Sequence, residues 1–223
     1  MGFFPVSLQL AHRPCVVVGG GAVARRKVEG LLACEAAVTV ISPRLDGELE
    51  RLSRAGALRW LDREYREGDL AGAFLVIAAT DDEAVQARVY AEAERDNLLL
   101  NVADVPKWCN LILPAVVRRG DLSLAVSTGG ASPALAARLR RELEESYGDE
   151  YRLLLALLAG LRPLVIGRGG GHQVNCRCFK ELVAADLAGW IRQGRWDLVL
   201  KHVEECIGSP EALAVVDRVK NEG

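Results

Sequence analysis

The sequence predicts an α/β protein with a Rossmann-type parallel sheet, followed by a small α+β region and a helical C-terminal domain. Strand-like and helix-like segments alternate over residues 1–113, which is typical of right-handed βαβ units with helices on both faces of a sheet. After Pro114 the pattern changes to a short hairpin and then, from Glu150, to helical segments alone. The predicted division is therefore 1–113, 114–149 and 150–223.

The strands of the first part are short and apolar. Cys15–Val18 is a continuous apolar run that stops at three glycines, as expected of a strand buried inside a parallel sheet. Asp81 and Asp82 can cap the helix after the fourth strand, because a side-chain oxygen there accepts hydrogen bonds from free backbone amides. The other strands are expected at Val38–Ile41, Leu58–Leu61, Phe74–Thr80 and Leu98–Val102, and the helices at Ala24–Cys34 and Glu83–Asp96.

Beyond Pro114 the sequence predicts a hairpin and then helices. Ser132 and Pro133 open a basic helix, with a serine at the cap and a proline in the first turn. Arg168–Gly171 is a glycine-rich break between two later helices. The hairpin strands are expected at Ala115–Arg118 and Leu122–Ser127 around Gly120-Asp121. The helices are expected at Ala134–Glu145, Leu153–Leu161, Phe179–Gln193, Trp196–Ile207 and Pro210–Lys220.

Composition narrows the function classes. The 223 residues carry a formal net charge of −2, so no overall basic bias points to nucleic acid or to an anionic membrane surface. The longest apolar stretches are far shorter than the roughly 18–20 residues that a membrane span needs. The start lacks the pattern of a secretory signal, so a cytoplasmic location is expected. The cysteine and histidine spacings complete no four-ligand set, so no bound metal is expected.

A glycine turn after the first strand predicts a dinucleotide site. Residues 18–24 read Val-Gly-Gly-Gly-Ala-Val-Ala, which fits G-x-G-x-x-A between a strand and a helix. Gly19 permits the tight turn, and Gly21 lets the backbone approach a pyrophosphate. The helix that follows offers free amides and a partial positive charge to the phosphates. The expected cofactor contacts in this turn are Gly19, Gly20, Gly21, Ala22 and Val23.

The ends of two further strands should complete the cofactor site. The second strand ends in Ser42-Pro43 and Arg44, without the acidic residue that usually holds a ribose hydroxyl. Ser42 can bond that hydroxyl, whereas Arg44 could meet a 2′-phosphate, so these residues leave NAD and NADP open. Thr80 and Asp81 end the fourth strand at the same carboxyl edge of the sheet. We expect all of these except Arg44 to contact the cofactor, although helix capping explains the pair at the fourth strand equally well.

Asp104 is the candidate general base. It follows the fifth strand in Asn-Val-Ala-Asp-Val-Pro, near the expected position of the nicotinamide. A carboxylate there can accept a proton from a substrate that gives up hydride. The alternative is a loop aspartate that bonds its own turn.

Four separated motifs together resemble one family. They are Val-Gly-Gly-Gly-x-Val-Ala-x-Arg-Lys at Val18–Lys27, Ala-Ala-Thr-Asp-Asp at Ala78–Asp82, Asn-Val-x-Asp-x-Pro at Asn101–Pro106, and Val-Ser-Thr-Gly-Gly-x-Ser-Pro at Val126–Pro133. In this order they resemble the precorrin-2 dehydrogenase family, which includes the amino-terminal module of sirohaem synthase. The opening Phe3-Phe4-Pro5-Val6 agrees with it. The likeness covers about residues 1–150, and the remainder matches only in being helical.

The resemblance implies NAD-dependent oxidation of precorrin-2 to sirohydrochlorin on the route to sirohaem. It implies NAD as the oxidant, Asp104 as the catalytic residue, and a homodimer whose central region, 114–149, serves dimerisation. In some members of the family the same carboxylate also serves the insertion of Fe²⁺ into sirohydrochlorin.

A tetrapyrrole that carries many carboxylates needs cationic and hydrogen-bonding partners. An arginine can hold a carboxylate in a bidentate way, and the turn before the basic helix offers backbone amides. The expected substrate contacts are Lys107, Arg118, Ser127, Thr128, Gly129, Ser132 and Arg138. The alternatives are a solvated helix face on which Arg138 pairs with Glu142 or its neighbours, and a turn that closes the dimer interface. For the whole chain one alternative is a non-catalytic, NAD-binding redox sensor, which would need neither Asp104 nor the basic residues. The other is a dehydrogenase for another large anionic substrate.

Overall fold

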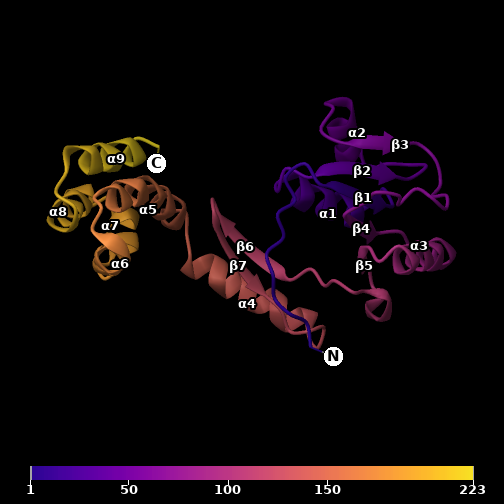
Figure 1. Ribbon diagram of the computed structural model, residues 1–223. Helices are drawn as coiled ribbons and strands as arrows, with labels where there is room; N and C mark the ends of the chain where they lie inside the picture. The colour runs from indigo at the N-terminus through magenta and orange to yellow at the C-terminus, as the bar shows by residue number, and fades with distance from the viewer. Residues whose placement is uncertain (1, 223) are drawn as a thin grey trace. The chain divides into compact units, whose positions relative to one another are not determined.

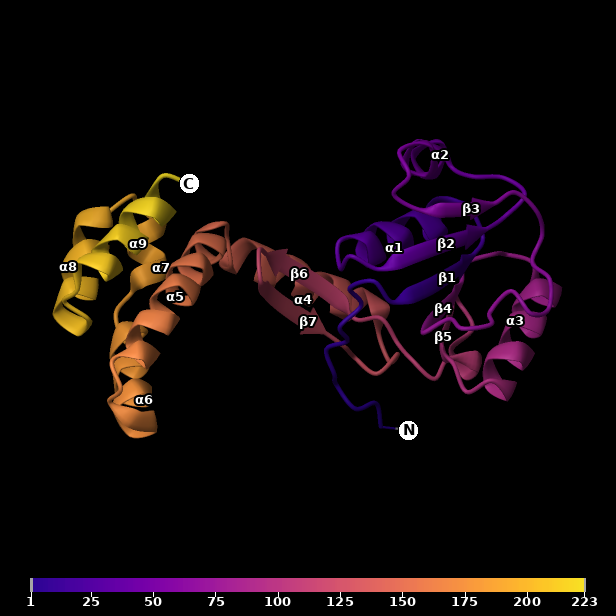
Figure 2. The same cartoon turned by 45° about the horizontal axis from the view of Figure 1, so that its top comes forward.

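The computed structural model describes residues 2–222, which form two compact units that divide after Leu113 (Figures 1 and 2). The predicted fold class is confirmed. The first unit is a parallel sheet with helices, and the second holds a two-stranded antiparallel sheet followed by helices. Within residues 2–222 no helix is both long and apolar enough to span a bilayer.

The first unit is built on a five-stranded parallel sheet with the strand order β3-β2-β1-β4-β5. Val18 of β1 pairs with Ile41 of β2 and with Ala78 of β4, so these strands end at one edge of the sheet. The direction of strand progression reverses between β1 and β4, and sheets of this kind bind ligands outside the carboxyl ends of the strands at such a point. The strands are β1 (Pro14–Val18), β2 (Ala37–Ile41), β3 (Arg59–Leu61), β4 (Leu75–Ala78) and β5 (Leu99–Val102).

Helices cover both faces of this sheet, as the apolar runs in the strands predict. Val17 points into a core shared with Val28 of α1 and Leu49 of α2. Its neighbour Val18 points to the other face, into a core shared with Val89 of α3. The helices are α1 (Ala22–Leu32), α2 (Gly47–Arg54) and α3 (Glu83–Arg95), and the 3-10 helix η1 (Pro106–Trp108) follows β5.

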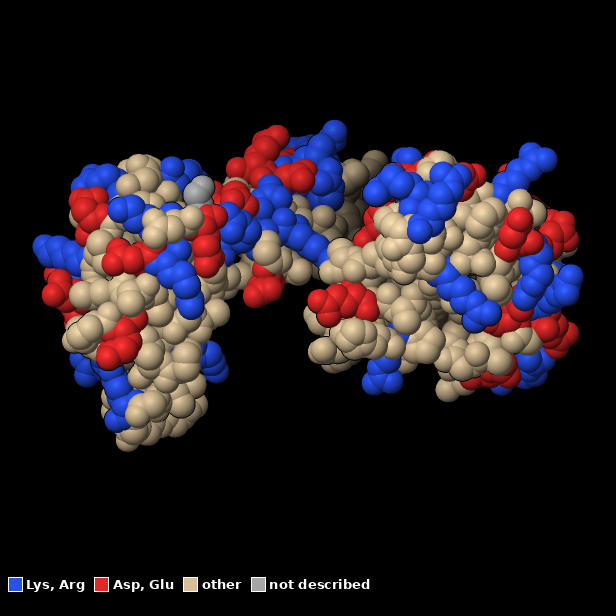
Figure 3. Space-filling view, turned by 90° about the horizontal axis from the view of Figure 1, so that it is seen from above, with Lys and Arg blue, Asp and Glu red and all other residues tan. Residues whose placement is uncertain are grey.

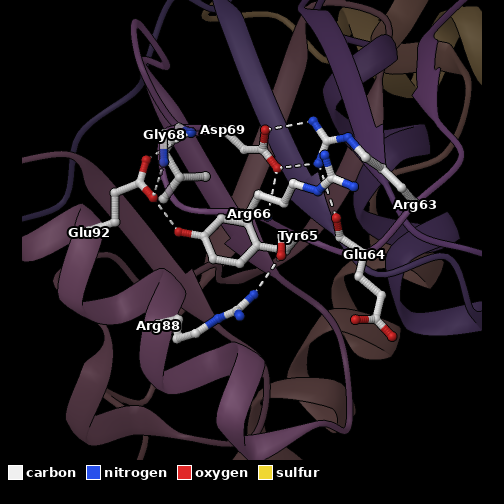
Figure 4. A network of polar contacts seen from close by, with 9 residues as sticks. Arg63, Glu64, Tyr65, Arg66, Gly68, Asp69, Arg88 and Glu92 are labelled. Atoms are coloured by element: carbon white, nitrogen blue, oxygen red, sulfur yellow. Dashed lines mark hydrogen bonds and ion pairs between the residues drawn. The ribbon is translucent and has the colours of Figure 1, made fainter.

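A buried carboxylate fastens the loop between β3 and β4 to α3 (Figure 4). Glu92 of α3 is 2% exposed and accepts hydrogen bonds from the backbone amides of Gly68 (2.9 Å) and Leu70 (3.0 Å) and from the Tyr65 hydroxyl. Arg88 of the same helix donates to the Tyr65 carbonyl oxygen at 2.5 Å. Because a buried carboxylate is costly to separate from its donors, this network fixes the path of the chain into β4.

The second unit begins with the predicted hairpin and basic helix. β6 and β7 pair antiparallel, with Ala115 opposite Val126, and α4 contacts both strands. The Ser132 hydroxyl caps α4 by accepting a hydrogen bond from the Leu135 amide at 3.2 Å. The elements are β6 (Ala115–Arg119), β7 (Leu122–Val126) and α4 (Pro133–Ser146).

Five further helices enclose a separate apolar core. Leu157 and Leu161 of α5, Val203 of α8 and Val216 of α9 are fully buried in it. The helices are α5 (Glu150–Gly167), α6 (Gly171–Leu182), α7 (Leu187–Arg192), α8 (Trp196–Cys206) and α9 (Pro210–Lys220).

The helix predicted at Phe179–Gln193 is wrong, because the chain breaks within it. α6 ends at Leu182, and the Asp186 carboxylate then caps a new helix, α7, by accepting from the Gly189 amide at 2.9 Å. α6 also begins earlier than predicted, at Gly171. Other differences are smaller. α5 is longer than the predicted Leu153–Leu161, and α2 was not predicted, since its polar sequence buries Leu49 alone.

Candidate functional site

A cavity of about 900 Å³ lies at the carboxyl edge of the parallel sheet. It is bordered by the residues that follow β1, β2, β4 and β5. All the predicted cofactor contacts line it, together with Asp104; these are Gly19, Gly20, Gly21, Ala22, Val23, Ser42, Pro43, Thr80 and Asp81. The fold therefore brings together residues that are up to 85 positions apart in the sequence, Gly19 and Asp104 being the outermost of them.

The glycine turn is packed tightly against the neighbouring strand ends. A Cβ atom on Gly19, whose φ is 121°, would lie 2.2 Å from the Ala79 carbonyl oxygen. A Cβ atom on Gly20 would lie 1.9 Å from the Arg44 carbonyl oxygen. Gly21 differs, because a Cβ atom there would meet nothing within 4 Å. Gly19 and Gly20 thus shape the turn, and Gly21 borders the open cavity.

The amino end of α1 suits an anion. Gly21 is the N-cap residue, and it offers no side chain to the free amides of the first turn. The first turn of α1 also contains no acidic residue. The amides and the positive end of the helix dipole are therefore free to meet phosphate groups.

The loop after β2 carries an acidic residue that the sequence analysis missed. Asp46 lines the cavity, caps α2 by accepting from the Glu48 amide at 3.0 Å, and pairs with Arg25 at 3.3 Å. Its own amide donates to the Gly20 carbonyl oxygen at 2.7 Å. The signal was present as an aspartate in front of a glycine and two glutamates, a pattern that favours a helix start. The Ser42 hydroxyl, which the sequence analysis expected to bond a ribose hydroxyl, donates instead to the Arg44 carbonyl oxygen at 2.7 Å.

At the end of β4 the capping and the cavity-lining roles fall on different residues. Asp82 caps α3 by accepting from the amides of Ala84 (2.9 Å) and Val85 (3.0 Å). Asp81 and Thr80 line the cavity. The capping alternative therefore applies to Asp82, and Asp81 is exposed at the cavity.

Asp104 stands on a strained turn directly after β5. Its φ is 60°, a left-handed conformation that aspartate tolerates better than most residues do. Its side chain is exposed, and the residue lines the cavity. Burial lowers the pKa of Lys27 in α1, as does Arg26, while the Asp104 carboxylate acts in the opposite direction. Lys27 is thus a cation within electrostatic reach of Asp104.

Lys107 lies three residues farther on, in η1. It is exposed, and its Nζ atom lies 5.2 Å from the centre of the Trp108 ring. Lys107 is not among the residues that line the cavity.

The remaining predicted substrate contacts belong to the second unit. The Thr128 hydroxyl donates to the Ser132 carbonyl oxygen and accepts from its amide, both at 3.1 Å. Ser127 accepts from the Gly129 amide at 3.2 Å, so the turn bonds itself. Arg118 is exposed on β6, and Arg138 pairs with Glu142 at 2.8 Å on α4. Basic and acidic side chains are likewise interspersed on the face shown in Figure 3.

Comparisons with known proteins agree with this geometry. A family model described as "Putative NAD(P)-binding" matches residues 6–115, and one described as "Sirohaem biosynthesis protein central" matches residues 119–146. The fold, the glycine turn and the first match define the class, an NAD(P)-binding protein of the Rossmann type. Together the two models match well over half of the chain.

Relatives and a solved structure narrow the class further. Siroheme synthase of Thioalkalivibrio sulfidiphilus (strain HL-EbGR7) is 38% identical over 207 residues, which is 93% of this chain and 42% of the relative. That of Nitrosospira multiformis (strain ATCC 25196 / NCIMB 11849 / C 71) is 45% identical over 199 residues, 87% of this chain and 42% of the relative. The structure of "SirC, precorrin-2 dehydrogenase" matches with a TM-score of 0.74 and 28% identity, over 98% of this chain and 100% of that one. The chain belongs to the sirohaem-biosynthesis family that these proteins represent, and it spans about two fifths of the siroheme synthases.

Proposed function

We propose that this chain is a precorrin-2 dehydrogenase, which uses NAD to oxidise precorrin-2 to sirohydrochlorin in sirohaem biosynthesis. The observation that carries the proposal is that Asp104 and the glycine turn line one cavity. A dinucleotide held at the turn would extend across the carboxyl edge of the sheet, towards the end of β5. The names of the matching structure and relatives support this substrate.

The reaction removes two hydrogens from the macrocycle, one as hydride and one as a proton. When bound, the nicotinamide accepts the hydride. Asp104 takes the proton through its exposed carboxylate, and the fixed turn on which it stands holds that carboxylate at the cavity. Lys27 provides a positive charge near the carboxylate, as the effect of Asp104 on the pKa of Lys27 indicates.

We propose NAD rather than NADP as the cofactor because of Asp46. A carboxylate beside the cavity can accept hydrogen bonds from ribose hydroxyls and repels a 2′-phosphate. Arg25 pairs with Asp46 and weakens that repulsion, but the carboxylate oxygens of Asp46 remain the hydrogen-bond acceptors. The loop after β2 therefore has an acidic residue at Asp46, although Ser42, Pro43 and Arg44 directly after the strand are not acidic.

For the substrate we propose the contacts that the sequence predicts. Lys107 of η1, Arg118 of β6 and Arg138 of α4 supply the cations, and Ser127, Thr128, Gly129 and Ser132 supply a turn before a helix. Arg138 would exchange Glu142 for a substrate carboxylate, since an exposed ion pair of this kind contributes little. We also propose that residues 114–149 join two copies of the chain and that residues 150–223 form a helical domain.

The test is turnover by the purified chain. Precorrin-2 and NAD are mixed with the protein, and the absorbance of sirohydrochlorin and of NADH is followed. We expect Asp104→Asn to lower turnover by about 100-fold or more while NAD affinity stays within about twofold. Asparagine is the better variant than alanine because it also tolerates a positive φ. Asp62→Ala removes an exposed carboxylate of the same unit outside the cavity and should change neither quantity.

The same assay separates the alternatives. Tight NAD binding without turnover by the wild-type protein would overturn the dehydrogenase and favour the redox sensor. Full turnover by Asp104→Asn would remove Asp104 from the mechanism. Adding Fe²⁺ after the oxidation tests the iron insertion that the resemblance implies, with loss of the sirohydrochlorin spectrum as the readout.

A further inference from the structure

The thiol of Cys109 contacts both sides of the turn that carries Asp104. Its Sγ atom accepts a hydrogen bond from the Val102 amide at 3.2 Å. The Val102 and Val105 carbonyl oxygens lie 3.3 Å and 3.5 Å from Sγ, where the thiol hydrogen can reach either one. Asn101, which is buried, directs its side-chain amide at the same sulfur atom at 3.8 Å. One half-buried side chain therefore spans the chain from the end of β5 to the residue after Asp104.

The turn needs such a contact because the backbone bond that closes it across Asp104 is long. The Ala103 amide donates to the Ala78 carbonyl oxygen at 2.8 Å, which anchors the side nearer to β5. The Val105 amide reaches the Val102 carbonyl oxygen only at 3.5 Å. Between these two bonds stands Asp104, whose φ of 60° is a costly conformation that the surroundings must maintain.

We propose that Cys109 is a positioning residue for Asp104, and that its thiol closes the turn and keeps the carboxylate at the cavity. The role rests on the proposed function only in its effect on turnover, since the closure itself is a property of the turn. A sulfur atom with one donor and weak acceptor capacity suffices here, because its partners are backbone groups on one short segment. Serine can make the same bonds with a shorter reach, whereas alanine can make none.

The experiment compares Cys109→Ala with Cys109→Ser. We expect Cys109→Ala to lower kcat by about tenfold while the KM for NAD stays within about twofold, because a small misplacement of a base lowers rate more than binding. Cys109→Ser should recover kcat to within about threefold of the wild type. Cys206→Ala, which removes another half-buried thiol from α8, is the matched control and should leave kcat unchanged.

Amide hydrogen exchange provides a readout that does not depend on precorrin-2. Exchange at Val102 and Val105 should be faster in Cys109→Ala and close to wild type in Cys109→Ser. Unchanged exchange in Cys109→Ala, or a kcat that serine does not restore, would overturn the inference. If the wild-type protein shows no turnover, the proposed function fails, and the exchange result still decides whether the thiol closes the turn.

Discussion

The chain contains two runs of three glycines, Gly19–Gly21 and Gly169–Gly171, and the two runs have different surroundings. In the first run, Cβ atoms on Gly19 and Gly20 would lie 2.2 Å and 1.9 Å from backbone carbonyl oxygens. In the second run, Cβ atoms on Gly169 and Gly171 would meet nothing within 4 Å, and one on Gly170 would meet the Val174 side chain, at 2.8 Å from Cγ1, rather than a backbone carbonyl oxygen. Gly19 and Gly20 are required by the backbone that packs against them, whereas Gly169 and Gly171 are required by their own backbone angles.

That difference separates a binding turn from a connection. The carbonyl oxygens that press on the first run come from the ends of β4 and β2, so the turn is held rigidly at the edge of the sheet. In the second run Gly169 and Gly171 have φ values of 70° and 75°, which end α5 and start α6. A rigid turn can present amides to a ligand in a fixed direction, whereas a connection only has to reverse the chain.

Gly19→Ala should produce the largest effect and makes the contrast measurable. The alanine would combine a strained φ of 121°, worth about 1–3 kcal/mol, with a clash against the backbone of β4's end. Gly171→Ala carries the strain alone. Thermal unfolding should show a midpoint lowered by roughly 10 °C or more for Gly19→Ala and by only a few degrees for Gly171→Ala. Equal shifts would mean that packing does not distinguish the two runs.

Gly21→Asp should strongly weaken cofactor binding while the fold survives. A side chain fits at Gly21, since nothing lies within 4 Å of the added Cβ atom, but its charge would occupy the place proposed for the pyrophosphate. We expect NAD affinity to fall by about 100-fold, with an unfolding midpoint near that of the wild type. Titration of the protein with NADH, followed by fluorescence, measures the affinity. Gly170→Asp is the control in the second run, and a loss of NADH binding there would contradict the assignment.

Local patterns predicted the sheet and the glycine turn because each signal is complete within a few residues. Cys15–Val18 and the glycines after it need no information from elsewhere, and the same holds for Asp104 at a strand end. Asp46 was missed because its place at the cavity depends on contacts with Arg25 and Gly20, which are more than 20 residues away. The break before α7 was missed because an apolar sequence continues through it, and only the cap formed by Asp186 marks the start of a new helix there.

Asp46→Asn should change the cofactor preference by a smaller factor. The loop that presses on Gly20 also carries Asp46, the residue proposed to favour NAD over NADP, so this variant extends the contrast with the second run. Asparagine keeps the cap on α2 but removes the charge. We expect the ratio of NAD to NADP affinity to fall by about tenfold, measured by titration with each cofactor. Asp82→Asn alters a matched cap that lies outside the cavity, and a similar change in that variant would argue against a specific role for Asp46.

Acid should weaken the second unit slightly, through an ion pair that does not involve its glycine run. Burial alone would raise the pKa of Glu150, but hydrogen bonds from Arg192 and from the backbone outweigh it and lower that pKa. Because the folded-state pKa lies below the ordinary value of 4.5, the stabilisation is present above about pH 4.5 and is lost as the pH falls through the folded-state pKa.

The measurement follows the thermal unfolding of the chain as the pH is lowered. Its midpoint should fall by a few degrees below pH 4.5 in the wild type, and the fall should be smaller in Glu150→Gln, which has no carboxyl group to protonate. Glu142→Gln alters an exposed pair on α4 and should keep the wild-type dependence. An unchanged acid dependence in Glu150→Gln would show that other carboxylates govern the acid sensitivity of this unit.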